Sequence, residues 1–165
     1  MSGLEVYIDA ECNDLLPRVS KVHIVVVRQL GAGYTKRFHD ADALRAAIPK
    51  FKKVVFHAGL SYDLPVLRKV YGIPFKIGAK QDEWDGHPCE FVDTLHLSQL
   101  LNPDRVGGHS IAAWASLFGK TKIGKDITDW STPTEEMFQR CENDTLVGEM
   151  VYNYLLNEAK ERLNP

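Results

Sequence analysis

The sequence predicts an α/β protein with a mixed β-sheet flanked by helices. Three apolar, β-branched runs follow one another within the first 38 residues, and only turn-forming residues separate them. Beyond residue 40, segments with apolar residues at helical spacing alternate with short strand-like runs. We therefore expect three antiparallel strands followed by alternating helices and strands, within a single domain that spans residues 1–165.

The first half of the chain carries clear element boundaries. Strands are predicted at 4–11, 22–27, 34–38 and 53–57. Asp40 is a typical N-cap for a short helix that Pro49 ends, and Ser61 is expected to cap the next helix, which Gly72 ends.

The second half contains more polar segments. We expect an exposed loop at 76–88, because this stretch is rich in Gly, Asp and other polar residues. A short strand at 91–94 should lead into a helix at 95–101, and residues 107–110 should open a further helix. A long final helix is expected from Thr134 onward.

Composition limits the possible functions. The net charge of −2 gives no overall attraction to nucleic acid, so any such binding has to be local or depend on bound cations. No apolar run is long enough to cross a membrane, and no signal peptide is recognisable. The three cysteines lack C-x-x-C spacing, which suggests a reducing compartment and no zinc site. We expect a cytoplasmic protein with no membrane partner.

Two acids end the first predicted strand. Side chains alternate along a strand, so Asp9 and Glu11 should point to the same side. Like charges in a half-buried place repel each other unless a cation lies between them, and oxygen ligands suit Mg²⁺ or Mn²⁺. The alternative to a metal site is that a D-x-E pattern on its own marks an exposed strand end with solvated acids.

Two further acids occupy suitable positions. Asp63 lies at the start of a helix that follows a strand, where a carboxylate is favoured. Asp144 lies within the final helix. Each acid taken singly is typical of a helix cap or a solvated surface, and only their order along the chain is informative.

That order resembles the DEDD superfamily of 3′–5′ exonucleases, and most closely the proofreading domain of bacteriophage-type family A DNA polymerases. The resemblance implies an RNase H-like core in which Asp9, Glu11, Asp63 and Asp144 hold two divalent ions, Mg²⁺ or Mn²⁺. The matching stretches are 7–16, 55–65, 92–95, 108–114 and 141–144.

The sequence departs from the family pattern at two positions. The family usually has Tyr or His about one helical turn before the last Asp, and this chain has Arg140 there. Arg140 could pair with Asp144 and compete with metal, or it could bind a phosphate oxygen and act in catalysis. Ala58 stands where the family often has Asn, which removes a hydrogen bond to the nucleotide.

The resemblance also implies contacts to nucleic acid. Leu15 corresponds to an apolar wedge between bases, with ordinary core packing as the alternative, and Tyr62 is suited to stacking on a base or sugar. His57 and His109 are expected near the site as hydrogen-bonding side chains.

The expected function is therefore metal-dependent 3′–5′ hydrolysis of single-stranded DNA. The protein would act alone or as a proofreading partner of a separately encoded polymerase, in the bacterial host cytoplasm if a phage encodes it. One alternative is a protein of the same fold that binds single strands and has lost catalysis through Arg140. The other is an RNA-directed exonuclease.

Overall fold

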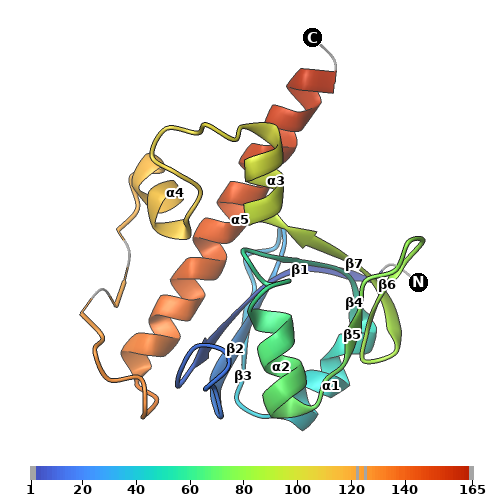
Figure 1. The fold of residues 1–165 in the computed structure, drawn as a ribbon, viewed down its shortest axis with the longest axis vertical. Coiled ribbons are helices and arrows are strands. Elements are labelled where there is room, and N and C mark those ends of the chain that lie inside the picture. The colour runs from blue at the N-terminus through green and yellow to red at the C-terminus, as the bar shows by residue number, and fades with distance from the viewer. Residues whose placement is uncertain (1–2, 122, 125, 164–165) are drawn as a thin grey trace.

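A seven-stranded mixed sheet forms the centre of the computed structural model, which describes residues 3–121, 123–124 and 126–163 (Figure 1). Its strand order is β3-β2-β1-β4-β7-β6-β5. β1 is antiparallel to β2, which is antiparallel to β3, whereas β4 runs parallel to both β1 and β7. The predicted fold class is confirmed. The strands are β1 (Leu4–Cys12), β2 (Val22–Gln29), β3 (Thr35–Phe38), β4 (Phe51–Phe56), β5 (Phe75–Lys76), β6 (Asp82–Trp84) and β7 (His87–Asp93).

Helices cover both faces of the sheet. The longest, α5, has 29 residues and runs along one face (Figure 1). Among the described residues, none of the helices combines the length and apolar character needed to cross a bilayer. The helices are α1 (Ala41–Ala47), the 3₁₀ turn η1 (Ile48–Lys50), α2 (Asp63–Tyr71), α3 (Thr94–Leu101), α4 (Ile111–Leu117) and α5 (Glu135–Leu163).

The alternation of side chains along β1 decides which residues meet α5. Val6, Ile8 and Ala10 are buried in the large core that also contains the apolar residues of α1 and α2. Tyr7 points the other way and packs with Tyr152 of α5. Asp9 and Glu11 share the parity of Tyr7, so β1 directs both carboxylates to the α5 side of the sheet.

The segment 76–88 is not an exposed loop, and that prediction was wrong. It forms the β5–β6–β7 meander, with β6 antiparallel to both of its neighbours. Trp84 is fully buried against Phe51 and Phe91, with ring centroids 6.1 and 6.4 Å away. Asp82 accepts hydrogen bonds from the backbone of Gly78 and Phe91. The free energy gained by burying the ring of Trp84 thus outweighs the preference of the polar residues around it for a loop.

The start of α2 also differs from the prediction that Ser61 caps it. The helix begins at Asp63, and its N-cap residue, Tyr62, makes no side-chain capping bond. Ser61 instead donates its hydroxyl to the carbonyl of Ala58 at 2.9 Å, which closes the turn after β4. Asp63 thereby becomes the first residue of the helix, where the unpaired backbone N–H groups favour a carboxylate.

Candidate active site

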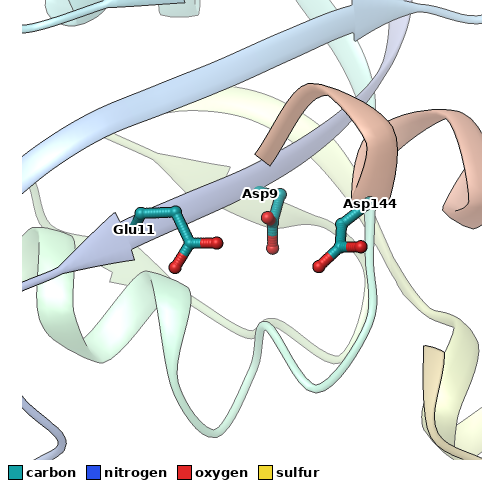
Figure 2. Close-up of side chains that lie close together, drawn as sticks. All are labelled: Asp9, Glu11 and Asp144. Atoms are coloured by element: carbon teal, nitrogen blue, oxygen red, sulfur yellow. The ribbon is translucent and has the colours of Figure 1, made fainter. Parts of the chain in front are cut away.

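Three carboxylates converge between β1 and α5. Oxygen atoms of Asp9, Glu11 and Asp144 all lie within 4.8 Å of one another. Figure 2 shows the three side chains pointing toward a common space, two from the strand and one from the helix. We call these three residues the acid trio. Its spacing suits one small cation bound by several oxygens.

A close contact between β1 and α5 sets the position of the acid trio. Gly148 faces the ring of Tyr7, and a Cβ atom at residue 148 would lie 2.0 Å from Cζ of that ring. Tyr7 precedes Asp9 by one strand repeat, and Gly148 follows Asp144 by about one helical turn. The helix can therefore approach the strand closely enough to bring Asp144 beside Asp9.

Asp63 lines the same cavity as the acid trio, but its carboxylate is not among those whose oxygens lie within 4.8 Å of one another. Its side chain is buried, and within the described part of the chain its Oδ1 atom has no hydrogen-bond partner. An unpaired buried carboxylate oxygen is costly, and a coordinated cation would remove that cost. Asp63 therefore fits as a fourth ligand.

The electrostatics of the site also favour a cation. Burial raises the pKa of Asp9 well above its ordinary value, and the nearby charges of Asp63, Glu11 and Asp144 raise it further. Burial likewise raises the pKa of Asp63 to about 7, although the amide hydrogens of Asp63 and Ala10 favour its ionised form. A divalent ion would reverse this repulsion, so the four acids fit Mg²⁺ or Mn²⁺.

The acids lie in a cavity of about 550 Å³, which is a size typical of small-ligand sites. Leu15, Tyr62 and His57, three of the four residues expected to contact nucleic acid, line it. The side chain of Leu15 is 66% exposed, so it does not serve as core packing. The hydroxyl of Tyr62 donates to the carbonyl of Asp14 at 2.9 Å, which holds this ring in the cavity wall.

The two histidines differ in their surroundings. Nδ1 of His57 lies 2.9 Å from the hydroxyl of Thr94, and burial lowers the pKa of His57 to about 4, so the ring is uncharged at neutral pH. His109 is not among the residues that line the cavity. Its ring nitrogens lie 2.7 Å from Oγ of Ser98 and 3.2 Å from the carbonyl of Pro103.

Comparison with known sequences gives distant relatives. No family model matches the chain. The DNA-directed DNA polymerase of Enterobacteria phage T3 is 25% identical, over 91% of this chain and 26% of the polymerase. The DNA-directed DNA polymerase of Escherichia phage T7 is 24% identical over the same shares. The chain thus spans about a quarter of the length of these relatives.

Comparison with solved structures gives stronger likenesses. Brucella melitensis NrnC bound to pGG has a TM-score of 0.68 and 20% identity, over 97% of this chain and 75% of NrnC. Escherichia coli RNase D, an exoribonuclease, has a TM-score of 0.66 and 16% identity, over 96% of this chain and 40% of RNase D. The chain has the RNase H-like exonuclease fold. The sequence resemblance to DEDD exonucleases is thereby confirmed.

Within this exonuclease fold, the turn after β4 adopts an unusual backbone. Ala58 has a φ of 61°, in the left-handed region that residues with a Cβ atom avoid. Asp93 stabilises this turn because its carboxylate accepts hydrogen bonds from the amides of Ala58, Leu60 and Leu95 at 2.9–3.1 Å. The turn places His57 and Asp63 on the wall of the cavity.

Replacing Ala58 by glycine should stabilise the protein by about 1 kcal/mol, because glycine adopts a positive φ without strain. For a chain of this size the melting temperature should rise by about 2–4 °C. The matched control is Ala46→Gly on the exposed side of α1, which should lower the stability by about 1 kcal/mol. Thermal unfolding of both variants checks the two opposite signs, and a loss of stability in Ala58→Gly would contradict the strain argument.

Two residues of the exonuclease fold have surroundings that the sequence did not indicate. Trp130, to which the sequence assigned no role, lines the cavity. Its ring lies 4.9 Å from the guanidinium carbon of Arg140, whose Nε lies 3.0 Å from Oε1 of Glu11 and 3.9 Å from Oδ2 of Asp144. The i,i+4 spacing of Arg140 and Asp144 made their pairing one of two alternatives, but no sequence signal indicated that Glu11 is the nearer partner.

Proposed function

We propose that the protein is a metal-dependent 3′–5′ exonuclease that acts on the ends of single-stranded DNA. The observation that supports it most is the convergence of Asp9, Glu11 and Asp144 within 4.8 Å, beside the buried Asp63, on an exonuclease fold. The resemblance to DEDD exonucleases supports the 3′–5′ direction.

Each group of residues has a role in this proposal. Asp9, Glu11, Asp63 and Asp144 would hold the divalent metal. When bound, such a metal lowers the pKa of a water and stabilises the charge that develops on the leaving oxygen of a phosphodiester. Leu15 and Tyr62 offer apolar and aromatic surface to the terminal bases, and the uncharged His57 offers a hydrogen bond.

The choice of DNA over RNA rests on the polymerase relatives. The match to the phage DNA polymerases covers 91% of this chain. NrnC, solved with pGG, and RNase D, an exoribonuclease, are each less than 25% identical to this chain. Their similarity therefore supports the fold and does not indicate the substrate. A DNA polymerase is accordingly the protein partner that we propose.

The assay uses oligonucleotides of DNA and of RNA, each labelled at the 5′ end, with Mg²⁺, Mn²⁺ or EDTA. We expect a ladder that shortens from the 3′ end of DNA with either metal, and no digestion in EDTA. A phosphorothioate linkage at the 3′ end should slow digestion, and the same linkage at the 5′ end should not. Shortening from the 5′ end, or digestion in EDTA, would overturn the proposal.

A second candidate function has one specific observation in its favour. The ion pair between Arg140 and Glu11 places a positive charge beside the acid trio. An active enzyme would need these same carboxylates to bind metal. A protein that binds single strands without cutting them would fit this contact. The same assay separates the two functions, because a pure binding protein would retard the labelled oligonucleotide on a gel and leave its length unchanged with both metals.

A further inference from the structure

The guanidinium of Arg140 is held on several sides at the edge of the acid trio. Nε lies 3.0 Å from Oε1 of Glu11, the ring of Trp130 faces the guanidinium carbon at 4.9 Å, and Nη1 donates to the carbonyl of Gly124 at 3.3 Å. Only about a fifth of the Arg140 side chain is exposed, at 20%. Buried charge pairs of this kind are much less screened by solvent than surface pairs.

The backbone also restricts the position of Arg140. A Cβ atom on residue 124 would lie 3.1 Å from Cδ of Arg140, and Gly124 has a φ of 67°. The carbonyl of Trp130 is in turn bound by Nε2 of His23 at 2.7 Å, which ties the segment that carries Trp130 to β2. Moving the guanidinium away from Glu11 would therefore break its contacts to the carbonyl of Gly124 and to the ring of Trp130.

We propose that Arg140 is a built-in cation that takes the place of one of the two divalent ions, so that the chain binds a single ion. The guanidinium neutralises Glu11, and the ion would be held by the remaining carboxylates of Asp9, Asp63 and Asp144. This inference rests on the proposed metal-dependent function. It revises two of its details, because the chain binds one ion in place of the two that the sequence resemblance implies, and Glu11 pairs with Arg140 instead of holding that ion.

Charge and geometry support a single ion. Among the described side chains of the acid trio, Asp63 and Arg140, the four carboxylates carry four negative charges and the guanidinium offsets one, which leaves a net charge of −3. One divalent ion then reduces the site to −1, whereas two would leave it at +1 with a guanidinium and two ions crowded among the same oxygens. The Arg140 Nε atom lies at contact distance from Glu11, so a second ion would have to displace it and separate it from Trp130.

The number of bound ions can be measured without any assay of activity. Calorimetric titration of the metal-free protein with Mn²⁺ should give one ion per chain for the wild type. Arg140→Gln should bind two, because glutamine removes the charge and vacates the space beside Glu11. Circular dichroism confirms that each variant is folded.

Arg162→Gln is the matched control, because Arg162 lies on the same helix and pairs with Glu158 at an i,i+4 spacing similar to that of Arg140 and Asp144. It should bind one ion, like the wild type. Equal numbers of ions in the wild type and in Arg140→Gln would overturn the inference and leave the proposed function standing. A wild type that binds no ion while Arg140→Gln binds some would overturn the single-ion claim. If neither protein binds an ion, the proposed metal-dependent function fails as well.

Discussion

Replacing Asp9 by asparagine should lower the rate of DNA digestion by at least about 10³-fold, because it removes the carboxylate at the centre of the site and with it several kcal/mol of metal-dependent stabilisation. The same change should make the metal-free protein more stable, by on the order of 1–3 kcal/mol. Carboxylate oxygens within 4.8 Å of one another repel each other by about 3 kcal/mol or more at an effective dielectric constant of about 20, and asparagine removes that repulsion.

The two effects of Asp9→Asn are measured separately. Digestion of a labelled single strand with Mn²⁺ gives the rate, and urea unfolding in EDTA gives the stability. Asp42→Asn is the control, because this acid is exposed and lies in the first turn of α1. It should leave the rate unchanged and lower the stability by about 0.3–1 kcal/mol, opposite in sign to the expected effect of Asp9→Asn. A variant that is both inactive and less stable in EDTA would contradict the repulsive site, since a merely structural role for Asp9 predicts that combination.

The acids of the site could be predicted from the sequence because each lies on an element with a strong local signal. Asp9 and Glu11 end a run of apolar residues, and the two-residue period of a strand puts both on one face. Asp63 follows a strand and begins a helix, and Asp144 lies within a long helical pattern. That the four acids meet was implied by the resemblance of their order along the chain to that of the DEDD exonucleases.

What could not be predicted depends on contacts between distant segments. The burial of Trp84 converts a polar stretch into the β5–β6–β7 meander, and nothing local distinguishes that tryptophan from one in a loop. The place of Trp130 in the cavity depends on the hydrogen bond from His23, more than a hundred residues earlier. The preference of Arg140 for Glu11 over Asp144 requires the distance between β1 and α5, which no spacing within one helix reveals.

The distance between β1 and α5 is set at Gly148, so Gly148→Ala should lower both stability and activity. In an exposed helix this change would stabilise by about 1 kcal/mol, because alanine has the higher helix propensity. Here the new Cβ atom would lie 2.0–2.5 Å from ring atoms of Tyr7, so α5 has to move away from β1. Such overpacking typically costs about 1–3 kcal/mol. We expect the melting temperature to fall by roughly 2–12 °C. We also expect the digestion rate to fall by about 10²-fold, because a shift of about 1 Å separates Asp144 from Asp9.

A second substitution tests whether the Tyr7 ring is the cause. In a Tyr7→Val background the space facing residue 148 is empty, so adding Gly148→Ala should be neutral or stabilising by up to about 1 kcal/mol. The sign of the alanine effect should thus reverse between the two backgrounds. Asn153→Ala, on the exposed surface of α5, should change stability by only a few tenths of a kcal/mol in either background. If Gly148→Ala were equally destabilising with and without the ring, α5 would be positioned by other contacts, and the closeness of Asp144 to Asp9 would need a different origin.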